Sequence, residues 1–155
     1  MSYLAYAYET GATGKPDREL AEIWYKRGYE AGSLSALMQL SYLYLMTGRF
    51  DLAEEILQSG AEKRYSLATY VLGRHYVFGP EKHRNSAEGL KLLRRAADIG
   101  NIYAKRDLGH ILMGGERGWL ERAAGFYMYI GGFISIFFIS LRKPNDPRLD
   151  MYGIY

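Results

Sequence analysis

An internal repeat is the feature that most constrains what this chain of 155 residues can fold into. Three stretches carry a small residue, a leucine four positions later with another small residue directly after it, and a large side chain three positions further on. These stretches are Ala36, Leu40, Ser41 and Tyr44; Ala68, Leu72, Gly73 and Tyr76; and Ala104, Leu108, Gly109 and Leu112. The N-terminus joins the same register with Leu4, Ala5 and Tyr8. Such self-similarity indicates an array of stacked structural units.

A second set of spaced residues follows each of the first three stretches. Its members are Ala21, Trp24, Gly28 and Gly32; Ala53, Ile56, Gly60 and Arg64; and Gly89, Leu92, Ala96 and Gly100. The period is 32 residues from Gly32 to Arg64 and 36 residues from Arg64 to Gly100. Steps of three and four residues place each set on one stripe of an α-helix. Each unit is therefore predicted to be a helical hairpin whose apolar stripe is covered by its neighbours.

Short polar and glycine-containing segments separate the predicted helices. The clearest are residues 11–17, 47–51 and 79–86. Asp17 and Ser86 stand where helices begin, and their side chains are of the type that caps a helix N-terminus. We expect these two residues to be N-caps.

Composition excludes several classes of protein. Hydrophobic residues make up 48% of the chain and only 4 residues are proline, so enough apolar surface exists to form a core. The absence of cysteine excludes a disulfide scaffold, a thiolate zinc site and a cysteine nucleophile, and it fits a reducing compartment. The first eight residues, MSYLAYAY, lack the basic start of a signal peptide, so none is expected.

The spacing resembles a known family. An alanine is followed after three residues by Leu-Gly and after two more residues by a tyrosine. A glycine loop then leads to a second helix with alanine, tryptophan, a small residue and glycine. This pattern is similar to the Sel-one-like repeat, a tetratricopeptide-like α/α hairpin. The third unit matches best, with ATYVLGRHYVFG at 68–79 and EGLKLLRRAADIGN at 88–101. The second unit departs from the pattern, because Arg64 replaces the terminal glycine.

The repeat and the resemblance together predict an all-α fold. We expect an α/α solenoid, a right-handed superhelix of helical hairpins, with an apolar C-terminal helical segment. The repeat region is assigned to residues 1–131, divided at about 2–33, 34–66, 67–101 and 102–131. The apolar segment covers 123–141, and an extended tail covers 142–155.

The segment 123–141 contains no charged residue and is bounded by Arg122 and by Arg142 with Lys143. Its nineteen residues meet the length of a membrane span, but its glycines and serines make insertion marginal. The alternatives are an in-plane membrane anchor, a docking surface for another protein or a further copy, and a buried terminal helix. A terminal cap should present a polar outer face, whereas apolar residues here occupy every side.

The low net charge argues against nucleic-acid binding, and the absence of catalytic motifs argues against an enzyme. The net charge is only +3, although residues 67–155 carry thirteen basic and eight acidic side chains. None of the common hydrolase, zinc or dinucleotide motifs is present in the sequence. The histidines, His75, His83 and His110, have no paired carboxylates at ligand spacing. We expect no enzymatic activity, no metal, no cofactor and no small-molecule substrate.

The remaining candidate is a partner-binding wall on the first helix of each hairpin. If the core leucine of each such helix defines zero degrees, residues two positions after it and two positions before it lie near 200° and 160°, opposite the core. The two resulting columns are Tyr6, Tyr42, Arg74 and His110, and Met38, Tyr70 and Arg106. These side-chain types are common at protein interfaces. By the same register, Tyr8, Tyr44 and Tyr76 are core residues.

Three functional hypotheses follow. The first is a non-enzymatic adaptor or scaffold that grips a protein or peptide with its concave wall, in the cytoplasm, either free or attached to the inner membrane. The second, which the resemblance implies, is an immunity-type protein that neutralises a secreted bacterial toxin. The third is a membrane assembly factor that oligomerises through residues 123–141.

Overall fold

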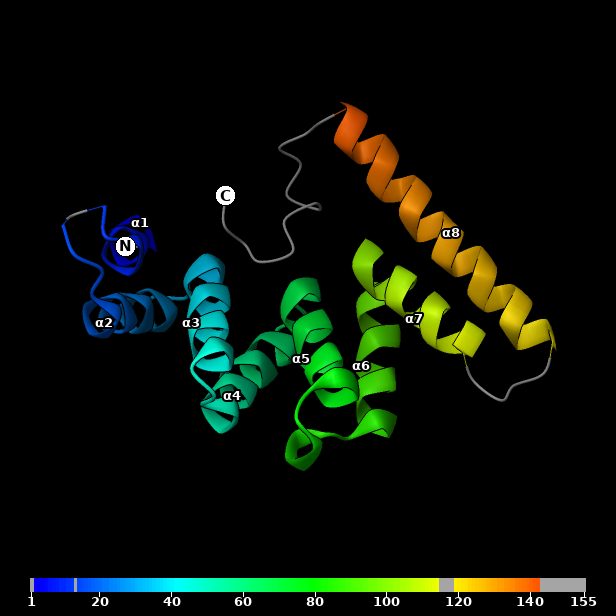
Figure 1. The fold of residues 1–155 in the computed structure, drawn as a ribbon, viewed down its shortest axis with the longest axis horizontal. Helices are drawn as coiled ribbons and strands as arrows, with labels where there is room; N and C mark the ends of the chain where they lie inside the picture. The colour runs from blue at the N-terminus through cyan, green and yellow to red at the C-terminus, as the bar shows by residue number, and fades with distance from the viewer. Residues whose placement is uncertain (1, 13, 115–118, 143–155) are drawn as a thin grey trace. The chain divides into compact units, whose positions relative to one another are not determined.

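The structure, a computed structural model, describes residues 2–12, 14–114 and 119–142. Over these ranges every regular element is helical (Figure 1). The helices are α1 (Ser2–Thr10), α2 (Arg18–Glu30), α3 (Leu34–Met46), α4 (Phe50–Glu62), α5 (Ser66–Phe78), the short 3₁₀ helix η1 (Glu81–His83), α6 (Ser86–Asp98), α7 (Ile102–Gly114) and α8 (Trp119–Arg142). The predicted all-α fold of sequential hairpins with an apolar C-terminal helix is confirmed.

The chain divides into two compact units, with the boundary inside α4 after Gly60. In the first unit, α1 packs against α2 and α2 against α3. In the second unit, α5 packs against α6, α6 against α7 and α7 against α8. Each unit is described by itself below.

The repeat residues form the core, as their periodicity predicts. The alanines that open the three stretches, Ala36, Ala68 and Ala104, are fully buried. The leucines that follow them, Leu40, Leu72 and Leu108, are at most 2% exposed. Small side chains at these positions let helices approach closely, and the leucines fill the space between them. The tyrosines of the same register differ: Tyr44 is buried, whereas Tyr8 and Tyr76 are only half-buried.

Glycine pairs mark a close crossing of α5 with α6 and another of α7 with α8. A Cβ placed on Gly73 of α5 would lie 3.1 Å from the carbonyl oxygen of Gly89 on α6. A Cβ on Gly109 of α7 would lie 2.6 Å from the carbonyl oxygen of Gly125 on α8. Gly109 follows Gly73 by 36 residues, and Gly125 follows Gly89 by the same 36 residues. The two pairs therefore occupy equivalent positions of the repeat. The period of the sequence is thus also a period of backbone contact.

Capping follows local chemistry, with one correction. The carboxylate of Asp17 accepts a hydrogen bond from the backbone N–H of Leu20 at 3.0 Å, so Asp17 is the N-cap of α2 as expected. The N-cap of α6 is Asn85, whose side chain accepts from the N–H of Glu88 at 3.2 Å. Ser86, predicted to be that cap, is instead the first residue of the helix. Asparagine caps a helix as well as serine, so sequence alone could not separate the two neighbours.

The second repeat has Arg64 in place of the terminal glycine, and Arg64 adopts the backbone conformation of that glycine. Gly32 and Gly100 end their hairpins with φ of 82° and 94°, and Arg64 has φ of 60°. This left-handed conformation is easy for glycine and strained for other residues. The turn geometry of the repeat is therefore kept at Arg64 despite the side chain.

The last helix differs from the predicted division at residue 131. A single helix, α8, runs from Trp119 to Arg142 and continues through the expected end of the fourth unit. Arg142 is helical, and the rest of the predicted extended tail, 143–155, lies outside the described residues. Within the described chain, Arg122–Arg142 is long and apolar enough to cross a membrane, with mean hydropathy 1.7.

Candidate functional site

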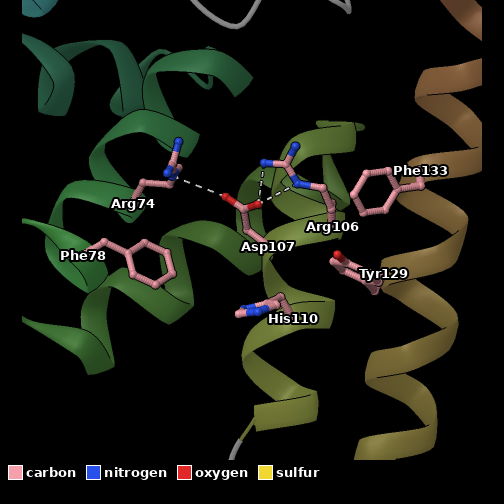
Figure 2. A pocket seen from close by; sticks show the side chains of 7 residues that line it. All are labelled: Arg74, Phe78, Arg106, Asp107, His110, Tyr129 and Phe133. Carbon is pink, nitrogen blue, oxygen red and sulfur yellow. Dashed lines mark hydrogen bonds and ion pairs between the residues drawn. The ribbon is translucent and has the colours of Figure 1, made fainter.

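The candidate site is a pocket of about 300 Å³ in the second unit. Three helices contribute to it: α5, α7 and α8 (Figure 2). Its lining side chains are Arg74, Phe78, Arg106, Asp107, His110, Tyr129 and Phe133. Three of the seven residues that the sequence proposed for partner binding, Arg74, Arg106 and His110, therefore line one pocket.

Asp107 organises the pocket. Its carboxylate lies between the two arginines (Figure 2), and its side chain is 11% exposed. Arg106 donates from Nε and Nη2 to Oδ1 at 2.9 and 2.7 Å. The hydroxyl of Tyr70 donates to Oδ2 at 3.0 Å, and Nε of Arg74 lies 3.3 Å from the same oxygen. One carboxylate thus positions two guanidinium groups and a phenol.

Ionisation in this cluster follows its burial and charges. Burial raises the pKa of Tyr70, and the negative charge and hydrogen bond of Asp107 raise it further. Burial by itself would lower the pKa of Arg106, but the hydrogen bonds and charge of Asp107 outweigh burial and raise that pKa. Tyr70 is therefore a neutral hydrogen-bond donor and Arg106 a permanent cation at neutral pH.

Aromatic rings form the rest of the wall. Phe78 lies one turn after Arg74 on α5, with its ring 5.9 Å from the Arg74 guanidinium carbon. Tyr129 and Phe133 project from α8 and pack edge to face, with ring centroids 4.8 Å apart. The exposed ring of His110 lies 6.1 Å from Tyr129. The pocket therefore combines cationic donors with apolar ring surface.

The first of the two predicted columns is at the surface. Tyr6 is 45% exposed and His110 is exposed, while Tyr42 and Arg74 are half-buried. Tyr6 and Tyr42 belong to the first unit, so they are not part of the pocket that Arg74 and His110 line.

The second column was placed wrongly for two of its three members. Met38 is 3% exposed and Tyr70 is fully buried. The error came from treating the side opposite the core leucine as solvent-facing. In a stacked array that side also meets a neighbouring helix: Tyr70 stacks on Tyr103 of α7, with centroids 6.1 Å apart. Arg106, the third member, is only 23% exposed in its side chain.

Sequence reasoning missed four lining residues: Phe78, Asp107, Tyr129 and Phe133. Phe78 was detectable in principle, because residues four apart share a helix face and Arg74 was already a candidate. Asp107 directly follows Arg106 but was not considered. Tyr129 and Phe133 lie in the apolar segment, and only the packing of α8 along α7 brings them to the pocket.

The two remaining histidines lie near each other in the second unit. The rings of His75 and His83 have centroids 5.7 Å apart. His75 is 8% exposed and His83 is half-buried. Sequence spacing gave no sign of this proximity.

Comparison with known proteins gives one structural match. No model of a protein family matches the sequence, and no curated protein matches it either. The structure is similar to the crystal structure of a Sel1 repeat protein from Oxalobacter formigenes, with a TM-score of 0.71 and 25% sequence identity. The match covers 86% of this chain and 57% of that one, so this chain spans little more than half the length of its structural relative. The chain is thus a helical-repeat protein with the fold of Sel1 repeat proteins, a fold that is generally non-catalytic and typically serves as a scaffold for protein interactions.

Proposed function

We propose that this chain is a non-enzymatic, cytoplasmic adaptor that binds a protein partner through the pocket between α5, α7 and α8. The observation that carries the proposal is the convergence of Arg74, Arg106 and His110, which come from two different repeats, on one pocket walled by aromatic rings. Arginine and aromatic side chains dominate the energetic centres of protein interfaces. Helical-repeat proteins in general bind partners on surfaces formed by successive repeats.

The proposal is tested by comparing what two charge-matched variants retain. One variant carries Arg74→Gln and Arg106→Gln in the pocket. The control carries Arg94→Gln and Arg95→Gln, two exposed arginines of α6 that lose the same charge. We expect the wild type and the control to retain the same protein from a lysate of the native cell, identified by mass spectrometry. The pocket variant should lose it, and equal retention by all three would refute the proposal.

A second candidate function, attachment to a membrane surface, is favoured by the outer face of α8. Nine large apolar or aromatic side chains of this helix are each at least 38% exposed: Leu120, Phe126, Tyr127, Ile130, Phe133, Ile134, Phe137, Phe138 and Leu141. At about 100° per residue they fall within one face about 140° wide. Gly125 and Gly132 lie on the opposite side, against α7. A contiguous exposed apolar face of this kind marks an interaction surface.

Packing against α7 favours an orientation parallel to the membrane over a span. A Cβ on Gly132, midway along the apolar stretch, would lie 2.9 Å from Cβ of Arg106. If α8 crossed a bilayer in this arrangement, Arg106 and Asp107 would lie near the centre of the hydrocarbon, at a cost of several kcal/mol. With α8 in the interfacial plane, its apolar face enters the membrane and Arg122 and Arg142 meet anionic headgroups.

Co-sedimentation with vesicles of phosphatidylglycerol and phosphatidylethanolamine tests this second candidate. We expect the wild type to sediment, and Phe137→Glu to reduce the bound fraction strongly. Ile23→Glu, at a 46% exposed position of α2, should sediment as the wild type does. Release of the bound protein by alkaline carbonate would support the in-plane orientation, resistance to carbonate would support a span, and a chain that stays in solution would refute both.

A further inference from the structure

The chemistry of the pocket specifies the kind of partner segment that it fits, provided that the proposed adaptor function holds. Both oxygens of Asp107 already accept hydrogen bonds, Oδ1 from Arg106 and Oδ2 from Tyr70. The carboxylate is nearly buried, and Nε of Arg74 forms an ion pair with its Oδ2. Both oxygens of Asp107 are thus engaged within the protein, and an incoming anion meets the arginines instead.

The arginines keep donors for a partner. Nε of Arg74 lies 3.3 Å from Asp107 and is buried, and it finds no hydrogen-bond acceptor among the described residues. Its two terminal amino groups are the donors that a partner can reach. Arg106 contacts Asp107 through Nε and Nη2, which leaves Nη1. The Arg74 side chain is 42% exposed and lines the pocket, so a partner can reach it there. Guanidinium groups held in one orientation bind carboxylates with two parallel hydrogen bonds.

Charge balance selects the anion. Two arginines and one aspartate give the pocket a net charge of +1. A carboxylate neutralises this charge, whereas a phosphate dianion exceeds it and is repelled by Asp107 at short range. The neighbouring rings of Phe78, Tyr129 and Phe133 offer apolar surface to a second side chain. A volume of about 300 Å³ is at the lower end for ligand pockets, which suits one or two side chains.

We propose that the pocket recognises a carboxylate adjacent to an aromatic or large aliphatic side chain in a partner protein. The carboxylate binds the free donors of Arg74 and Arg106, and the apolar side chain packs against the rings of α5 and α8. The carboxylate belongs either to an Asp or Glu side chain or to a chain terminus.

Selection from a library of random displayed decapeptides tests this chemistry. On the wild type we expect enrichment of Asp or Glu next to Phe, Tyr, Trp or Leu. The same enrichment is expected on Arg94→Gln and should disappear on Arg74→Gln, whose surface position leaves the core intact. Circular dichroism of both variants checks that they fold. Peptides enriched on the wild type that carry no acidic residue and bind equally well with an amidated C-terminus, or peptides enriched equally on Arg74→Gln, would overturn the proposal.

Titration of the selected peptide by fluorescence anisotropy separates the sources of the anion. Replacing its acidic residue by the amide should weaken binding at least tenfold, and replacing the adjacent apolar residue by Ala should weaken it several-fold. If only the C-terminal amide of the peptide weakens binding, a terminal carboxylate is the ligand. Tighter binding of a phosphoserine version would contradict the charge argument.

The two proposals fail separately. If the pocket variant retains every protein that the wild type retains, the adaptor function at this site is wrong. If retention depends on the pocket but the selected peptides bind through neither an acidic residue nor a terminal carboxylate, the site stands and only its chemistry is wrong.

Discussion

Two carboxylate clusters, one in each unit, use the same side-chain types in different surroundings. In the first unit, Glu22 accepts from the hydroxyl of Tyr44 at 3.0 Å and pairs with Lys26 at 2.8 Å and Arg49 at 2.7 Å. In the second unit, Asp107 is bound by Tyr70, Arg106 and Arg74. In each case one arginine also lies over the ring of the tyrosine, at 4.4 Å for Arg49 and 5.8 Å for Arg74.

The difference lies in what the arginines do with their remaining donors. Arg49 also donates from Nε to the hydroxyl of Thr47 at 3.1 Å, so its contacts stay within the first unit. Arg74 directs Nε toward Asp107 at 3.3 Å, and its side chain lines the pocket to which α8 also contributes. The same local chemistry therefore gives a structural cluster in one unit and a candidate binding site in the other. The added element is α8.

The largest effect is expected from displacing α8. Gly109→Ala would place a methyl group against the backbone of α8 at Gly125, where no flexible side chain can yield. Overpacking of this kind lowers the free energy of unfolding by about 2 to 3 kcal/mol. Chemical denaturation measures it. Gly114→Ala, in the same helix but with open space around it, is the control and should stay within about 0.5 kcal/mol of wild type.

Removing each carboxylate charge compares the clusters directly. Asp107→Asn leaves Arg106, which is 23% exposed, without its anion, and should cost about 2 kcal/mol of unfolding free energy. Glu22→Gln should cost about 1 kcal/mol, because Lys26 and Arg49 are 51% and 38% exposed and regain water. Thermal and chemical denaturation of both variants give the ranking. A larger loss for Glu22→Gln would reverse the distinction drawn here.

Acid should weaken the first cluster. Burial opposes ionisation of Glu22, but hydrogen bonds from Lys26, Arg49 and Tyr44 outweigh it and lower its pKa below the ordinary value of 4.5. Stability from this group is therefore present above pH 4.5 and is lost as the pH falls through the lowered pKa. Between pH 6 and a pH below the pKa of Glu22, the wild type should lose about 1 kcal/mol more unfolding free energy than Glu22→Gln does. Denaturation midpoints of both proteins across this range test it, and parallel losses would contradict it.

The smallest effect concerns a residue outside both clusters. Arg64→Gly removes the strain of a left-handed φ of 60° and should raise the free energy of unfolding by roughly 0.5 to 1 kcal/mol. Arg94→Gly serves as the opposite control, because a glycine inside α6 should destabilise by a similar amount. A destabilising Arg64→Gly would show that the arginine side chain contributes more than its backbone strain costs.

Much of the fold was predictable because it depends on local pattern. The spacing of alanine, leucine and glycine along each stretch gave the hairpins, and the buried alanines show why: small residues recur where helices touch. Asp17 was identified as a cap from its own chemistry, while the choice between Asn85 and Ser86 was not resolved. The site was predictable in part, since Arg74 and His110 belong to the column that the helix register places opposite the core leucines, and both line the pocket.

The rest required the packed structure. Helical angle alone cannot tell solvent from a neighbouring helix, so Tyr70 and Met38 were placed outside although both are buried. The identity of Asp107 as the centre of the pocket depends on α5 and α7 lying close enough for Tyr70 and Arg74 to reach it. Tyr129 and Phe133 join only because α8 continues unbroken along α7. The sequence alone determined which residues share a helix face, because that depends on local geometry, whereas tertiary packing decided which faces remain open to a partner.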